Sequence, residues 1–95
     1  MVGETVIVDC RSTSNKTLTW LKQNISEERA GPITNSTNGK VLLQLQQKYH
    51  VEEPAEGHSR LKILNFQLSD EGMFICKESS ADKSIANMTL TGKLS

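Results

Sequence analysis

The chain has 95 residues, the length of one small domain, and its eleven basic and eleven acidic residues give a net charge of zero. A neutral chain has no charge excess to attract nucleic acid or an anionic membrane surface, so neither partner is expected. One Trp, one Tyr and two Phe leave little aromatic bulk for a core, so a covalent crosslink would contribute much of the stability.

Apolar residues at alternate positions predict the first two strands. Val6, Val8 and Cys10 share one face of an extended segment that runs from Gly3 to Cys10. In the next strand the inward face would carry Leu18, Trp20 and Lys22, and the outward face would carry Thr19, Leu21 and Gln23.

The middle of the chain is expected to contain turns and one further strand. Gly31-Pro32 interrupts any regular element, and Asn38-Gly39 is typical of a tight hairpin turn. The periodicity of Val41 to Gln46 fits either a strand or a short helix, and the flanking turn residues favour the strand.

Two strands around an acidic turn are expected next. Lys48 to Val51 is the first strand, Glu52 to Gly57 is the turn, and Ser59 to Leu64 is the second strand. Within the second strand, Leu61 and Ile63 would point inward.

The most regular pattern lies near the end of the chain. Asp70, Gly72, Phe74 and Cys76 recur at every second residue, which is the period of a strand. A hairpin loop over Ser79 to Lys83 and a last strand over Ser84 to Thr91 follow. The last strand would bury Ala86, Met88 and Leu90 and expose Asn87.

The order of these residues strongly resembles a variable-like (V/I-set) domain of the immunoglobulin superfamily. The matching positions are Gly3, Val6, Val8 and Cys10, then Trp20 to Gln23, then Leu61, Ile63, Phe66, Asp70, Gly72, Phe74 and Cys76. The long interval between Trp20 and Lys48 leaves room for one or two extra strands, as in variable-type domains. The usual tyrosine of the motif is Phe74 here, so the hydroxyl that ties the corner to upstream backbone is missing.

The resemblance implies an all-β fold, a two-sheet antiparallel immunoglobulin-like β-sandwich with Greek key connections, formed by residues 1–95 as a single domain. Since only Met1 and Val2 precede Gly3, the first strand of such a domain is largely missing. The implied contacts are an inter-sheet disulfide between Cys10 and Cys76, a core that includes Trp20, Leu61, Ile63 and Phe74, and an ion pair between Lys48 and Asp70.

Two cysteines could also be free thiols or half of a metal site. The absence of a Cys-x-x-Cys or Cys/His cluster favours the disulfide, and a disulfide implies an oxidising compartment. Asn-x-Ser/Thr sequons agree with that compartment and predict N-glycosylation at Asn15, Asn24, Asn35 and Asn87.

The sequence predicts no catalytic or metal centre and no cofactor. No serine stands in a Gly-x-Ser-x-Gly motif, and His50 and His58 lie in polar segments where we expect them to be solvated. Glu52, Glu53 and Glu56 lack the spacing of a calcium loop and read as a solvated acidic turn. An enzyme is therefore not expected.

The expected function is protein recognition by the extracellular part of a cell-surface receptor or adhesion protein. The chain contains no signal peptide or membrane span, so we expect it to be the ectodomain portion of a longer, single-pass plasma-membrane protein. The alternatives are a secreted soluble binding protein and a structural spacer of the intracellular muscle type.

The expected partner is another protein, either a second copy of the chain or a different protein, with no direct membrane contact. Family members often bind through the front sheet, and an apolar group there would mark a binding site, although scattered exposed apolar residues are ordinary. The candidate binding residues are Leu21, Gln23, Met73, Ile75 and Lys77.

Overall fold

Strands dominate the residues that the computed structural model describes, which are 2–12, 16–79, 81 and 83–91. In chain order the strands are β1 (Val6–Arg11), β2 (Leu18–Asn24), β3 (Gly31–Pro32), β4 (Tyr49–Ala55), β5 (His58–Ile63), β6 (Gly72–Glu78) and β7 (Ser84–Leu90). Two short 3-10 helices are η1 (Leu43–Leu45) and η2 (Leu68–Asp70).

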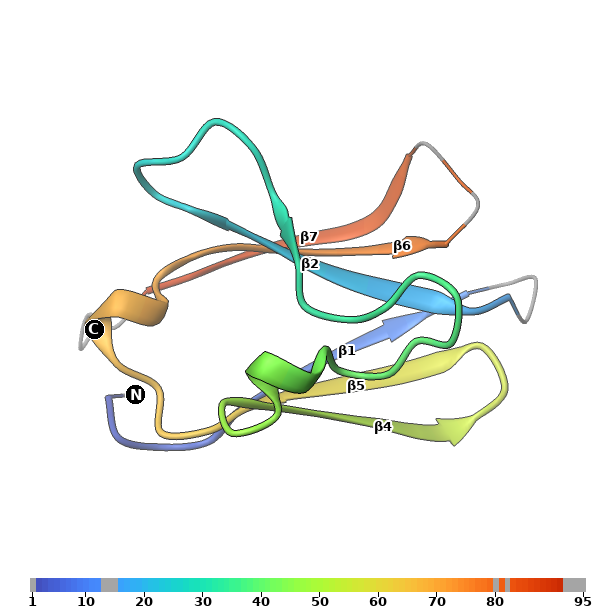
Figure 1. The fold of residues 1–95 in the computed structure, drawn as a ribbon, viewed down its shortest axis with the longest axis horizontal. Helices are drawn as coiled ribbons and strands as arrows, with labels where there is room; N and C mark the ends of the chain where they lie inside the picture. Colours follow the sequence, from blue (N-terminus) through green and yellow to red (C-terminus); the bar gives the residue numbers. More distant parts are fainter. Residues whose placement is uncertain (1, 13–15, 80, 82, 92–95) are drawn as a thin grey trace.

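The strands form two antiparallel sheets that lie one over the other (Figure 1). The back sheet has the strand order β1-β5-β4, and the front sheet has the order β3-β2-β6-β7. The chain passes from the back sheet to the front sheet after β1 and again after β5, so neighbouring strands come from distant parts of the sequence. This arrangement confirms the expected all-β sandwich.

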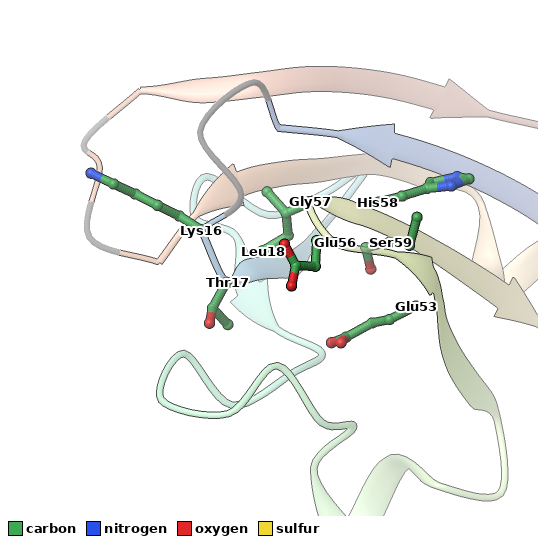
Figure 2. Close-up of a pocket in the computed structure, with 9 residues that line it drawn as sticks. Lys16, Thr17, Leu18, Glu53, Glu56, Gly57, His58 and Ser59 are labelled. Carbon is green, nitrogen blue, oxygen red and sulfur yellow. The ribbon is translucent and has the colours of Figure 1, made fainter.

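The hairpin between β4 and β5 departs from the expected acidic turn over Glu52 to Gly57. β4 continues to Ala55, and only Glu56 and Gly57 connect it to β5 (Figure 2). The register shifts between Glu52 and Ala55, around Pro54. β4 is an edge strand and is irregular at this point, and edge strands and irregularities are where a sheet tolerates proline, which has no N–H.

The prediction of a strand over Val41 to Gln46 is wrong. Only Val41 makes a β-bridge, to Thr34, and the helix η1 follows. Val41 and Leu45 pack against the core, whereas Leu43 is 82% exposed. Burial in this segment therefore does not follow the two-residue interval of a strand.

The chain after β3 folds back over β2 instead of forming long extra strands. Ile33 and Thr34 are buried, with exposed fractions of 2% and 1%. The connection from Thr34 to its bridge partner Val41 spans residues 35–40 and includes Gly39 at φ +71°. It is therefore wider than the two-residue turn expected at Asn38-Gly39.

The burial of Thr34 also buries Thr19, which the sequence placed on the outward face of its strand. The two threonine Oγ1 atoms lie 2.8 Å apart, and Thr34 Oγ1 accepts a hydrogen bond from Trp20 N at 2.8 Å. These bonds satisfy the buried hydroxyls, so the loop can cover this end of β2. The accessible outer face of β2 consequently begins at Leu21.

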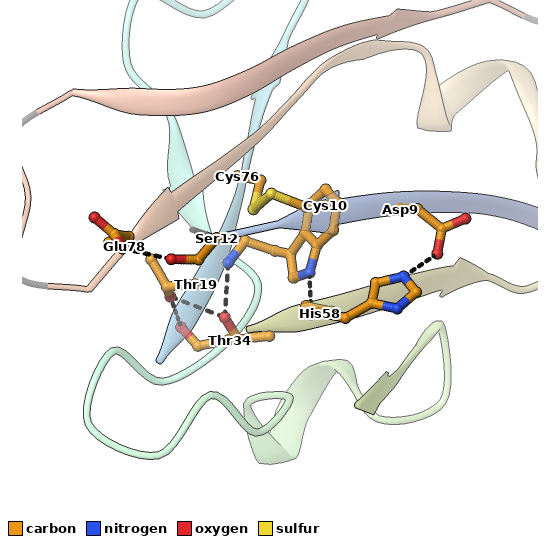
Figure 3. Close-up of a disulfide and its surroundings, with 10 residues drawn as sticks. Asp9, Cys10, Ser12, Thr19, Thr34, His58, Cys76 and Glu78 are labelled. Carbon is orange, nitrogen blue, oxygen red and sulfur yellow. Dashed lines mark hydrogen bonds and ion pairs between the residues drawn. A yellow bond between two sulfur atoms is a disulfide. The ribbon is translucent and has the colours of Figure 1, made fainter. Parts of the chain in front are cut away.

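A disulfide joins the two sheets (Figure 3). Cys10 Sγ in β1 lies 2.04 Å from Cys76 Sγ in β6, which confirms the expected pair. Trp20 is paired with Cys76 across β2 and β6, is fully buried, and donates a hydrogen bond from Nε1 to Ser59 Oγ at 2.8 Å. The other side chains with 0% exposure are those of Leu61, Ile63, Phe66, Phe74 and Cys76.

Asp70 holds the corner that leads into β6. Its Oδ2 atom lies 2.5 Å from Lys48 Nζ and accepts a hydrogen bond from Gln67 N at 2.8 Å. Lys48 Nζ also donates to Asn65 O at 2.9 Å. Because Asp70 is buried, water screens this ion pair less than a pair on the open surface.

Lys22 provides another link at this corner, where Phe74 has no hydroxyl. Lys22 Nζ lies 5.7 Å from the centroid of the Phe74 ring and donates a hydrogen bond to Ser69 O at 3.2 Å. Burial lowers the pKa of Lys22, because desolvation disfavours its charged form. The corner also requires glycine at position 72. A Cβ on this residue would lie 2.5 Å from Gln23 O, and the φ angle of Gly72 is +154°.

We predict that Asp70→Ala lowers the free energy of unfolding by about 2–4 kcal/mol, since it removes the ion pair and leaves Gln67 N without its acceptor. Asp70→Asn should cost less, because an amide oxygen can still accept from Gln67 N. Urea unfolding of both variants measures the difference. Asp9→Asn, in an exposed ion pair, is the control and should have a much smaller effect. Equal losses for Asp70→Ala and Asp9→Asn would contradict the role of the corner.

Tyr49 provides a test by pH. Burial, and then the negative charge of Asp70, raise the pKa of Tyr49 to about 12, whereas the unfolded value is 10.0. The neutral phenol is therefore favoured in the folded protein, and its contribution to stability is complete below pH 10 and is lost between about pH 10 and pH 12. Tyr49 is the only tyrosine, so tyrosinate absorbance reports it alone. A folded-state midpoint near 10, or an unchanged alkaline stability profile in Tyr49→Phe, would contradict this prediction.

Candidate protein-binding surface

The outward side chains of β2 and β6 bring together the residues that the sequence proposed for partner binding. We call this surface the front face, and it consists of Leu21, Gln23, Met73, Ile75 and Lys77. The two strands pair so that Leu21 lies directly opposite Ile75 and Gln23 lies opposite Met73. Residues opposite one another in an antiparallel pair have Cβ atoms roughly 4.5–5.5 Å apart, so the two aliphatic side chains are neighbours. All five side chains are partly exposed.

The register extends this pair into a row across the whole front sheet. Pro32 in β3 lies opposite Leu21, and Asn87 in β7 lies opposite Ile75. The row Pro32–Leu21–Ile75–Asn87 thus has two aliphatic residues at its centre, a proline at one end and a sequon at the other. Sequence reasoning missed Pro32 because Gly31-Pro32 indicated only a break in structure.

Ile85 is a further apolar residue on the exposed side of β7, with 43% of its surface exposed. It lies beside the register shift between Cys76 and Lys77 of β6. Its position two residues before Asn87 gives it the same outward parity, so the sequence carried a signal for it. The inward residues of β7 are Ala86, Met88 and Leu90, and they pack against the core as expected.

Lys77 is engaged within the domain. Its Nζ atom donates a hydrogen bond to Ala81 O at 3.0 Å and so ties β6 to the loop that follows. Two residues of the expected Ser79–Lys83 loop, Ser80 and Asp82, lie outside the described residues. Lys77 therefore supports the edge of the front face, while Leu21 and Ile75 form its centre.

The outer face of the back sheet has a different character, because its charges pair with each other. Asp9 Oδ1 lies 2.8 Å from His58 Nε2 and 3.1 Å from Arg60 Nε, and Lys62 pairs with Glu52. The hydrogen bond from His58, followed by that from Arg60, lowers the pKa of Asp9. The side chain of His58 is only 10% exposed, so the prediction of a solvated His58 is wrong (Figure 3).

The expected glycosylation sites differ in their surroundings. Asn35 Oδ1 accepts a hydrogen bond from Thr37 N at 2.7 Å in an exposed turn. Asn24 Nδ2, the atom that would carry a glycan, donates instead to Glu27 Oε1 at 2.8 Å. Asn87 is exposed beside Ile75, and Asn15 lies outside the described residues.

A cavity of about 260 Å³ lies at one end of the sandwich (Figure 2). Its lining is mixed in charge and comes from the segment before β2 and from the β4–β5 hairpin, with Lys16, Glu53, Glu56 and His58 among its residues. Over the described part of the chain, no cluster of three or more His, Cys, Asp or Glu side chains is placed to hold a metal ion. Nor does any helix in that part have the length and apolar character needed to cross a bilayer.

Comparison with known proteins identifies the family. The model of the immunoglobulin V-set domain matches residues 1–92. No curated protein matches the chain. Among 319 matching solved chains, one comes from a structure described as "Structural basis of T cell specificity and activation by the bacterial superantigen toxic shock syndrome toxin-1". It is 18% identical, with a TM-score of 0.73, and the match covers 95% of this chain and 86% of that chain.

At 18% identity the solved structure supports the fold alone, whereas the family match covers almost the entire chain. Domains of this family are generally modules for protein recognition, and typically they are not enzymes. The disulfide and the family together indicate an extracellular setting. The chain belongs to the immunoglobulin V-set family.

Proposed function

We propose that residues 1–95 form a single recognition domain that binds another protein through the front face, without chemical turnover. The observation that carries this proposal is the Leu21–Ile75 pair, which places two partly exposed aliphatic side chains side by side at the centre of a four-strand sheet. Met73 adjoins them and can adapt its unbranched side chain to a partner. An apolar centre with a polar rim is the usual composition of a protein–protein interface.

The other exposed apolar residues support the choice of this face. Apart from Ile85 on β7 of the front sheet, those with large exposed fractions are Val2, Ile7, Ile25, Leu43 and Leu68, and each lies on a different element or loop. Isolated exposed apolar residues are normal on a soluble domain. The register brings apolar residues from neighbouring strands together on the front face, which is the pattern of a binding surface.

The sequon at Asn87 limits where the partner can lie. Asn87 is directly opposite Ile75, so a glycan attached there would stand at the border of the aliphatic centre. The open side of the front face would then be the one formed by Leu21 and Pro32. Lys77 and the loop at residues 79–83 would form its end.

We further propose that the domain belongs to the ectodomain of a single-pass receptor or adhesion protein. A disulfide between two fully or nearly buried cysteines suits an oxidising compartment, and the partner is either a second copy or a different cell-surface or secreted protein. A secreted soluble protein is the nearest alternative. A spacer of the intracellular muscle type fits less well, since the cytosol keeps most thiols reduced.

Glycosylation separates the extracellular proposals from the intracellular alternative. We predict that the protein secreted from mammalian cells loses mass on endoglycosidase treatment, with Asn35 among the occupied sites, since it lies in an exposed turn. Asn35→Gln should remove one glycan by mass spectrometry of the intact protein. A secreted protein without any glycan would argue for the intracellular alternative.

Mutation of the aliphatic centre tests the binding face. We predict that Ile75→Asp weakens partner binding by at least about tenfold, because apolar anchors at interface centres contribute at least about 1–2 kcal/mol. Ile7→Asp is the matched control, because Ile7 is 52% exposed on the opposite sheet, and it should leave binding unchanged. Fluorescent tetramers on cells that each express one surface protein measure binding to other proteins, and sedimentation equilibrium measures self-association.

Both variants should melt within a few degrees of the parent protein, because neither side chain belongs to the buried core. Loss of binding by Ile7→Asp alone would move the site to the back sheet. If neither substitution changes binding, the front face is not the recognition surface and the loops or a neighbouring domain must bind the partner.

A further inference from the structure

A second surface for protein contact lies along the free edge of β4. A groove of about 490 Å³ separates this strand from the segment that carries η1. We call it the edge groove, and it is lined by Val41, Gln46, Tyr49, His50, Val51 and Glu52. It lies on the back sheet and is independent of the front face.

The pairing of β4 with β5 determines which backbone groups face this groove. Leu64 N donates to Lys48 O at 2.9 Å, and the register continues antiparallel from that bond. Hydrogen-bonded and non-hydrogen-bonded pairs alternate in such a ladder, so Tyr49 and Val51 form the non-hydrogen-bonded pairs with β5. Their N–H and C=O groups consequently point away from β5, toward the groove.

Among the described residues, no strand pairs with β4 on this side. The N–H and C=O groups of Tyr49 and Val51 are therefore available to bond with an added strand. They alternate along β4 in the same way as the backbone groups of an extended chain. The opposite end of β4 is closed to pairing, because Pro54 lacks an N–H and lies at the register shift between Glu52 and Ala55. The accessible edge is thus short, from Tyr49 to Glu52.

The lining of the groove defines which side chains would fit. Val41 and Val51 line it from opposite sides and are partly exposed, so an aliphatic side chain suits the space between them. Glu53 follows directly after this edge and lines the adjoining cavity at the end of the sandwich, where its Oε1 lies 3.4 Å from the place that a Cβ added to Gly39 would take. Glu53 is exposed and forms no ion pair with any of the described residues.

We propose that the edge groove binds an extended peptide segment of a partner protein as an additional strand on β4. The segment would exchange backbone hydrogen bonds with Tyr49 and Val51, place an aliphatic side chain between Val41 and Val51, and place a basic side chain beside Glu53. Main-chain bonds supply affinity in this kind of recognition, and the side-chain sites supply selectivity.

The experiment titrates the isotope-labelled protein with a blocked peptide of about six residues that alternates threonine and valine and ends in lysine. We expect the largest amide shifts at Tyr49 and Val51, together with slower hydrogen exchange of these amides. The matched control peptide is N-methylated at alternate nitrogens along one edge, which removes the donors and keeps the side chains. It should bind at least about tenfold more weakly, because two or more hydrogen bonds are lost.

A charge exchange tests the selectivity. Glu53→Lys should weaken binding of the lysine peptide several-fold, and a peptide with glutamate in place of that lysine should recover the loss on this variant. Since Glu53 is exposed, the variant should fold, and its melting temperature checks that it does. Ile75→Asp should bind the peptide like the parent protein, so failure of the front-face proposal does not affect this result.

The proposal is overturned if the peptide does not bind, if the N-methylated peptide binds equally well, or if the shifts centre on Leu21 and Ile75. It is also overturned if the Tyr49 and Val51 amides shift with protein concentration when no peptide is present. In that case the strand that pairs with β4 belongs to a second copy of this chain.

Discussion

The junction of the disulfide with Trp20 holds the two sheets together. Cys10 and Cys76 come from different sheets, and Trp20 lies beside Cys76 with its indole N–H donated to Ser59 of the back sheet. A crosslink that closes a loop of this length stabilises the folded state by about 4 kcal/mol in the chain-entropy model. A domain of this size has a small core, so this contribution is a large part of its stability.

The outer faces of the two sheets differ in surface chemistry. On the back face the acidic and basic side chains of neighbouring strands neutralise one another, as Asp9 does with His58 and Arg60. Exposed pairs of this kind add little stability, and they leave few groups unpaired for a partner. On the front face the register places Leu21 against Ile75, and an apolar surface gains free energy when a partner removes it from water.

The ends and edges of the sandwich are protected unequally. The corner before β6 is secured by the ion pair of Asp70 with Lys48 and by the hydrogen bond from Lys22 to Ser69 O. Along β4, Pro54 and the register shift prevent pairing at one end only. The remaining edge of β4 combines available backbone groups with an adjacent groove, which makes it the second place where this domain can meet another chain.

The resemblance to the immunoglobulin superfamily predicted the sandwich and the disulfide, and the alternation of apolar residues predicted the central strands. The alternation around Val8, Trp20 and Phe74 is strong because a strand in a two-sheet core must bury every second residue, and local pattern alone carries that information. The inward and outward parity of β6 and β7 also predicted that Ile75 and Asn87 lie on the outer face, and the family resemblance made that face the candidate binding surface. The front-face residues follow from this parity, but their adjacency depends on the register.

Other features depend on contacts between segments that are distant in the sequence, and these contacts exist only in the folded protein. Thr19 is buried because Thr34, from a loop, covers it, and His58 is shielded because Asp9 of another strand binds it. Within Val41 to Gln46, whose pattern fits two periods, only Leu43 to Leu45 forms a 3-10 helix, and Val41 and Leu45 pack against the core. Propensity and periodicity depend on residues that are near one another in the sequence. The burial of a polar residue such as Thr19 or His58 depends instead on which distant segment packs against it.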